Sequence, residues 1–264
     1  MSEAADVDEA AVDGDENLEE GTLLSHLVEL RGRLLKIAAA VVFVFIGLLP
    51  FSRQIFSMVS EPLREVLPGQ AMIATAVAAP LLTPFKMTFF VALFIAMPVV
   101  LYQVWAFVAP GLYKKEKRFA MPLLASSIIL FYLGIAFAFF IVFPLMFNFF
   151  TAVAPEGVEV MTDITQFLDF ITTIIFAFGI AFEVPIATVL IVWTGLTTPK
   201  KLGAARPYVF LMAFVAGMFL TPPDVISQTL LAVPVYLLYE LGIFMSRIFV
   251  IKREESGDEA QTAE

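Results

Sequence analysis

Three carboxylates in unusual surroundings are the residues of this sequence best suited to binding chemistry. Glu29 and Glu116 each lie among basic residues, and Glu183 lies within a long apolar run close to Pro185. A carboxylate near a surface can pair with a guanidinium in a planar, bidentate geometry. A carboxylate inside a membrane costs roughly 2.5–3.5 kcal/mol and should face a cavity or a polar partner. These positions indicate recognition of cationic groups at a surface and one polar contact in an apolar interior.

Other chemistry finds little support in the sequence. The chain has no cysteine and a single histidine, His26, which excludes disulfides and thiol catalysis and makes a histidine-based metal site improbable. The apolar segments hold no Ser-Lys, Ser-His or paired-Asp constellation, and one glutamate is insufficient for an intramembrane hydrolase. No nucleotide-binding signature is present. The sequence predicts a protein that is not an enzyme, with no metal, cofactor or nucleic-acid partner.

The segments that carry these carboxylates are expected to lie in lipid. Of the 264 residues, 60% are hydrophobic and only 16% are charged, and the mean hydropathy is +0.89. In soluble domains about a quarter of the residues are charged. A soluble chain of this length could not bury so much apolar surface in one core. The sequence therefore predicts an all-α, polytopic integral membrane protein.

Six segments are candidates for membrane-spanning helices, since a bilayer core of about 30 Å needs roughly 20 helical residues. The predicted spans are residues 34–51, 87–109, 119–143, 170–193, 207–220 and 225–246. The last two should form a hairpin, and both are expected to be short. The segment 52–86 should be an ordered cap bent by its prolines, and residues 144–165 a second outer loop.

Basic residues orient this bundle. If the N-terminus is cytoplasmic, 13 of the 16 lysines and arginines fall in inner segments, so the positive-inside rule places both termini in the cytoplasm. Residues 1–21 are acidic and residues 251–264 are polar. Both ends lack the hydrophobicity to fold, and we expect disordered tails around a transmembrane domain of residues 22–250.

The residues alone leave less specific roles open. Glu29 fits an interfacial amphipathic helix with anchoring charges, and Glu116 an exposed ion pair worth under about 1 kcal/mol. Asp224 fits equally an N-cap of the sixth span or a contact with a partner. A secondary carrier with Glu183 as a proton relay would explain that residue, but neither the two surface carboxylates nor the short spans.

Five motifs together resemble the TatC family of the twin-arginine protein translocase. They occur in the family's order and spacing: HLVELRGRL from His26, the Pro-Leu at Pro62, PVVLYQVWAFVAPGLYKKEKR from Pro98, FGIAFEVP from Phe178 and TPPDVISQTLLAVPVYLLYE from Thr221. The resemblance extends over residues 22–250.

This resemblance implies a receptor for the Arg-Arg signal peptides of folded precursor proteins, with six helices in a concave, glove-like bundle. Glu29 and Glu116 would recognise the twin arginines beside Arg31, Lys117 and Arg118, where Lys117 replaces an arginine frequent in the family. Glu183 would lie on the hollow face within the membrane. Further positions that the resemblance associates with function or assembly are Pro62, Gln103, Phe107, Asp224 and Gln228.

The resemblance also implies the partners and the location. It predicts single-span TatA- and TatB-type partners, self-association in a receptor complex and contact with membrane lipid. The energy source would be the proton-motive force, and the site of action the bacterial cytoplasmic (inner) membrane.

Overall fold

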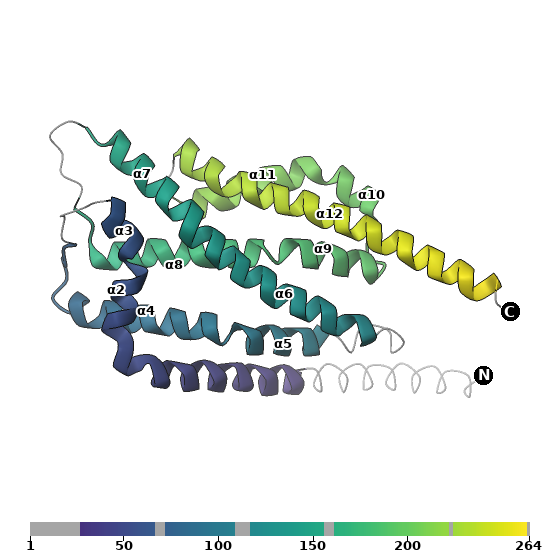
Figure 1. The fold of residues 1–264 in the computed structure, drawn as a ribbon, viewed down its shortest axis with the longest axis horizontal. Helices are drawn as coiled ribbons and strands as arrows, with labels where there is room; N and C mark the ends of the chain where they lie inside the picture. The colour runs from purple at the N-terminus through teal and green to yellow at the C-terminus, as the bar shows by residue number, and fades with distance from the viewer. Residues whose placement is uncertain (1–26, 67–71, 109–116, 156–160, 222–223, 263–264) are drawn as a thin grey trace, which may run out of the picture.

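The protein is a bundle of long helices (Figure 1). The computed structural model describes residues 27–66, 72–108, 117–155, 161–221 and 224–262. Within these ranges every regular element is a helix, apart from an isolated parallel bridge between Ile73 and Asp163. The predicted all-α fold is confirmed.

The elements run back and forth along the long axis of the bundle. In chain order they are the first helix (residues 27–48), η1 (Leu49–Phe51), α2 (Ser52–Val59), α3 (Glu61–Val66), α4 (Ala79–Ile95), α5 (Met97–Val108), α6 (Lys117–Phe137), the π-helical segment η3 (Ala138–Val142), α7 (Phe143–Val153), α8 (Ile164–Ala181), α9 (Val184–Trp193), α10 (Pro199–Ala204), α11 (Arg206–Leu220) and α12 (Val225–Thr262).

Prolines explain the breaks inside three of the crossings. Proline lacks the N–H that would bond to the carbonyl four residues earlier. Pro98 follows the 50° bend between α4 and α5, and the hydroxyl of Tyr132 donates to the freed carbonyl of Phe94 at 3.1 Å. Pro144 follows the π-helical segment η3, and Pro185 follows the break between α8 and α9.

Several helices run beyond the predicted spans. α4 starts at Ala79, and α7 occupies part of the segment 144–165 that was expected to be a loop. α2 and α3 lie in the predicted cap. α12 continues to Thr262, into the segment from residue 251 for which the sequence predicts a polar tail. Lysine, arginine, glutamate and alanine in that stretch favour a helix, which need not end where its apolar run ends. Residues 1–21 lie outside the described ranges.

The last two crossings differ in length. α11 has 15 residues, about 22 Å at 1.5 Å per residue, so the fifth crossing is short as predicted. The apolar part of α12, Val225–Ile248, has 24 residues and reaches about 36 Å. The prediction of a short sixth span is therefore wrong, because Gln228 and Glu240 are accommodated within one helix.

α8 and α9 form the centre of the bundle. In the apolar 18-residue stretch of Ile164–Trp193, 56% of the residues are buried inside the protein, compared with 6% in that of Leu27–Arg64, which begins with the first helix. The first helix therefore lies at the edge of the bundle (Figure 1), where Phe45 makes an edge contact with Phe89 of α4. The large side chains that are almost fully buried include Phe131, Phe143, Phe178, Met146, Leu168 and Ile171.

The elements gather at two ends of the bundle. The start of the first helix, the end of α5, the start of α6, the end of α9 and α10 lie at one end (Figure 1, right). α2, α3, the end of α7 and the start of α12 lie at the other. This alternation is the one that six crossings require, and it places Glu29 at the end where α5 stops and α6 begins.

Candidate functional site

Glu29 and Arg33 form the central contact of the candidate site. The Glu29 side chain is 39% exposed and that of Arg33 is 19% exposed. Oε1 of Glu29 accepts hydrogen bonds from Nε of Arg33 at 3.0 Å and from Nη2 at 2.5 Å. Oε2 of Glu29 has no hydrogen-bond partner among the described residues. One oxygen of this carboxylate is thus fixed by Arg33, and within the described ranges the other can accept a further donor.

Arg33 also joins the first helix to the end of α5. Its Nη2 donates to the carbonyl of Ala106 at 2.9 Å, and its Nη1 donates to Oε1 of Gln103 at 3.4 Å. The Ala106 carbonyl is one of the last four in α5, which have no acceptor role inside the helix. A cation at this end also interacts favourably with the helix dipole. Gln103 is buried, so the guanidinium of Arg33 donates to a side-chain oxygen that water scarcely reaches.

The other predicted recognition residues are placed only in part. Arg31 is exposed on the first helix, and Phe107 is half-buried in the last turn of α5. Lys117 and Arg118 begin α6. Glu116 lies outside the described residues. The structure therefore links Glu29 to Gln103 through Arg33, at the end of the bundle where α6 begins.

Arg33 was missed as a site residue in the sequence, where it counted only as an orienting base. Its position four residues after Glu29 was a usable signal, since residues at i and i+4 are neighbours on a helix. Its contact with Gln103, 70 residues away, could not be predicted from local spacing in the sequence.

Glu183 lies at the break between α8 and α9. Its Oε2 accepts a hydrogen bond of 2.6 Å from Oγ of Ser127, a fully buried residue of α6. Its Oε1 is buried and has no partner within the described ranges. The polar partner expected for this acid is therefore Ser127, and one carboxylate oxygen remains available to another donor.

The start of α12 carries a second polar group. The backbone N–H of Ser227 donates to Oδ1 of Asp224 at 2.7 Å, so Asp224 caps α12, which is one of the two roles that the sequence left open. Oδ2 of Asp224 and Oγ of Ser227 are buried without a partner in the described part of the chain. Gln228 is half-buried against α11, where its Cα lies 3.5 Å from the position that a Cβ on Gly217 would take.

An ion pair joins α11 to α12 at the opposite end of the hairpin. Arg206 binds Glu240 through two parallel contacts, Nε to Oε1 at 2.6 Å and Nη2 to Oε2 at 2.7 Å. The hydroxyl of Tyr236 also donates to Oε1 at 3.0 Å. This fork geometry is the strong form of an arginine–carboxylate pair, and it explains how Glu240 is accommodated in an apolar helix.

Polar contacts also organise the end of the bundle away from Glu29. Asp163 caps α8 by accepting from the N–H of Thr165 at 2.8 Å. Its Oδ2 accepts from the N–H of Thr75 at 2.9 Å and from the Thr75 hydroxyl at 2.8 Å. These bonds tie the segment before α4 to the start of α8. Pro62 is half-buried in α3, beside the buried Leu63.

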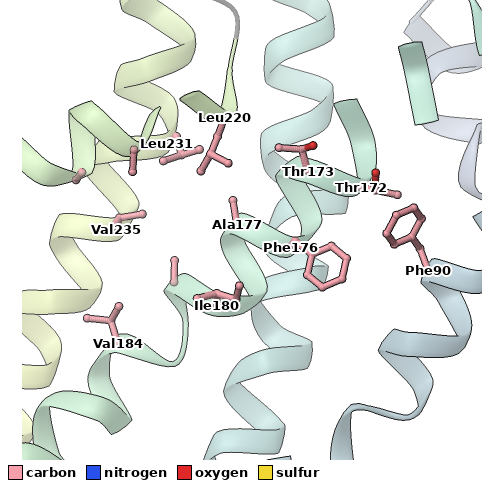
Figure 2. A pocket seen from close by; sticks show the side chains of 13 residues that line it. Phe90, Thr172, Thr173, Phe176, Ala177, Ile180, Val184, Leu220, Leu231 and Val235 are labelled. Atoms are coloured by element: carbon pink, nitrogen blue, oxygen red, sulfur yellow. The ribbon is translucent and has the colours of Figure 1, made fainter. Parts of the chain in front are cut away.

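An apolar hollow of about 540 Å³ opens between α4, α8, α11 and α12 (Figure 2). Phe90, Phe176, Leu220 and Val235 are among its walls, and the hydroxyl-bearing Thr172 and Thr173 are the polar exceptions. Val184 lines it, whereas the neighbouring Glu183 is not part of the lining and bonds to α6 instead. In the ranges described, no cluster of three or more His, Asp or Glu residues is placed to hold a metal ion.

The fold and the site together define the class of this protein. It is a helical, polytopic membrane protein with a half-exposed carboxylate site at one end. A family model described as Sec-independent protein translocase protein (TatC) matches residues 25–234. The chain belongs to the TatC family. It is therefore a component of a protein translocase and not an enzyme, which sets aside the hydrolase and the solute carrier.

Relatives and solved structures agree with this family. TatC of Azotobacter chroococcum mcd 1 is 60% identical over 223 residues, which cover 84% of this chain and 88% of the relative. TatC of Escherichia coli (strain K12) is 55% identical over 237 residues, with 88% and 92% covered. A crystal structure of the twin-arginine translocase receptor TatC superposes with a TM-score of 0.76 at 36% identity, covering 84% of this chain and 98% of that one.

Proposed function

We propose that this protein is the receptor for twin-arginine signal peptides, with Glu29 and Glu116 as the carboxylates that bind the two arginines. The observation that carries the proposal is the state of Glu29, which is half-exposed and has one oxygen without a partner among the described residues. An ionised carboxylate offers about four acceptor sites, so Glu29 can bind Arg33 and an incoming guanidinium together. The relative whose crystal structure superposes on this chain is itself named a twin-arginine translocase receptor.

The apolar character of the bundle indicates the path of the rest of the signal peptide. With its arginines at Glu29 and Glu116, the apolar part of the peptide would run along the helices towards the depth of Glu183. The buried Oε1 of Glu183 would then accept a donor from the peptide or from a partner helix. Arg31, Lys117 and Arg118 would surround the arginine site and keep less specific cations at a distance.

Partners and orientation complete the proposal. Single-span TatA- and TatB-type proteins would join this chain in a complex that also contains further copies of it, with the proton-motive force driving export of folded proteins. Pro62, Gln103, Phe107, Asp224 and Gln228 would serve assembly or the shape of the bundle. Both termini would face the cytoplasm of a bacterial cell, with the helices in its inner membrane.

The test is the binding of a fluorescent twin-arginine signal peptide to the full chain in lipid nanodiscs. A hydrogen bond to a charged group contributes about 1.5–3 kcal/mol, so Glu29→Gln and Glu116→Gln should each weaken binding by roughly tenfold to a hundredfold. Glu61→Gln is the matched control, because Glu61 is an exposed acid in α3 at the far end of the bundle. Wild-type affinity in both Glu29→Gln and Glu116→Gln would refute the proposed docking.

A further inference from the structure

We infer that Arg33 is a positioning residue that gives the Glu29 site its preference for arginine over lysine. The inference rests on the proposed docking of a signal-peptide arginine at Glu29. It adds a role for Arg33, to which the proposed function assigns none. Arg33 would not contact the peptide as its primary partner. It would act by holding the Glu29 carboxylate in one orientation.

The contacts of Arg33 make it a fixed part of the protein instead of a free surface charge. Two of its nitrogens donate to the same oxygen of Glu29, and the guanidinium also reaches the Ala106 carbonyl and Gln103. Only 19% of its side chain is exposed. A planar guanidinium with five donors can satisfy these acceptors from one plane, whereas a lysine ammonium is a compact point charge.

The orientation of Glu29 decides which cations it can discriminate. A planar guanidinium can donate two of its N–H groups to one carboxylate oxygen, as Arg33 does to Oε1 of Glu29, whereas an ammonium is a compact point charge. Because Oε1 of Glu29 is held by Arg33, the incoming cation would bind Oε2, which has no partner among the described residues. A carboxylate that rotates freely would accept an ammonium nearly as well as a guanidinium, so selectivity depends on the Arg33 contact.

Arg33 also sets the position of Glu29 relative to the end of α5. The Ala106 carbonyl lies in the last turn of α5, which ends at Val108, and Glu116 follows eight positions later. The first helix is otherwise poorly buried. The Arg33 contact therefore fixes the Glu29-bearing helix to the end of α5.

The sign of the expected effect separates this role from simple repulsion. If Arg33 only repelled a cationic peptide, its removal would strengthen the binding of every such peptide. If Arg33 positions Glu29, its removal weakens the binding of an Arg-Arg peptide specifically, even though a repelling charge is lost.

The experiment compares Arg-Arg and Lys-Lys signal peptides on the full chain in nanodiscs, with the ratio of the two affinities as the readout. Arg33→Gln should lower that ratio by roughly tenfold, mainly by weakening the Arg-Arg peptide. Arg33→Lys should keep the charge and still fail to restore the ratio. Lys36→Gln is the matched control, because Lys36 is an exposed base on the same helix, and it should leave the ratio unchanged.

Glu29→Gln separates failure of this inference from failure of the proposed function. A loss of Arg-Arg binding in Glu29→Gln, with a wild-type ratio in Arg33→Gln, would overturn the role of Arg33 alone. Equal weakening of both peptides, stronger binding of both, or full restoration by Arg33→Lys would overturn it too. Should Arg33→Gln fail to fold, as judged by thermal unfolding in the same nanodiscs, Arg33→Lys is judged on the same ratio.

Discussion

Asp163 is held in its charged form at the end of the bundle away from Glu29. The backbone N–H and the hydroxyl of Thr75 both donate to its carboxylate, and they lower the pKa of Asp163 from its ordinary value of 3.8 to about 2. Since the protonated form would lose these bonds, the ionised form is the one that the fold stabilises. The contact joins segments 88 residues apart in the sequence, so the charge of one side chain supports the connection between α4 and α8.

The depressed pKa of Asp163 predicts a pH dependence of stability. A carboxyl with a pKa lower in the folded state contributes stability that is complete above pH 4 and is lost as the pH falls towards 2. Asp163→Asn should therefore unfold at a lower temperature than the wild type at pH 6, and the difference should shrink between pH 4 and pH 2. Thermal unfolding in detergent at a series of pH values measures it. A difference that is constant over this range would contradict the assignment.

At the scale of elements, close contact between α9 and α12 depends on Gly242. A Cβ on Gly242 would lie 2.9 Å from Cα of Pro185 and would overlap the hydroxyl of Thr188. The obstacle is partly backbone, which cannot rotate away. α12 therefore packs against the break that carries Glu183, and the absence of a side chain at Gly242 is what allows it.

Gly242→Ala is predicted to destabilise the bundle despite the better helix propensity of alanine. Overpacking of a tight contact costs typically 1–3 kcal/mol, so the temperature of unfolding in detergent should fall by several degrees. Gly47→Ala is the matched control, because a Cβ on that helical glycine would meet nothing within 4 Å. It should leave the temperature unchanged or raise it, whereas an equal fall in both variants would count against the packing argument.

At the scale of the whole molecule, the six crossings fix which segments share a side of the membrane. The start of the first helix, the end of α5, the end of α9 and α10 must lie on one side, and α2, α3 and the start of α12 on the other (Figure 1). The basic residues predict that the first of these sides is cytoplasmic. The exposed Val77 and Leu196 lie on opposite sides in this scheme.

The absence of native cysteine makes the orientation directly testable. Val77→Cys should react with a membrane-impermeant maleimide in intact spheroplasts. Leu196→Cys should react only after the membrane is disrupted. Each variant serves as the control for the other, and the reverse pattern of labelling would show that the bundle is inverted.

The number and order of the crossings were predictable from the sequence, because lipid imposes long apolar runs and a charge asymmetry that need no tertiary contact to be recognised. Glu29 and Glu183 could likewise be selected from the sequence as candidates, because their surroundings are unusual for an acid. The lengths of α7 and α12 were not predictable to the same extent. A helix can continue through polar residues when they find partners, as Glu240 does with Arg206.

What only the tertiary structure decided is the set of partners. Ser127 binds Glu183 across 56 positions and Arg33 reaches Gln103 across 70, and no periodicity or local spacing relates such residues. The sequence by itself determined that Glu29 lies among basic residues and Glu183 in an apolar segment, because composition and hydropathy are properties of the chain alone. Among the described residues, the fold determined which oxygen of Glu29 and of Glu183 accepts a hydrogen bond, because hydrogen bonds depend on positions that only packed helices define.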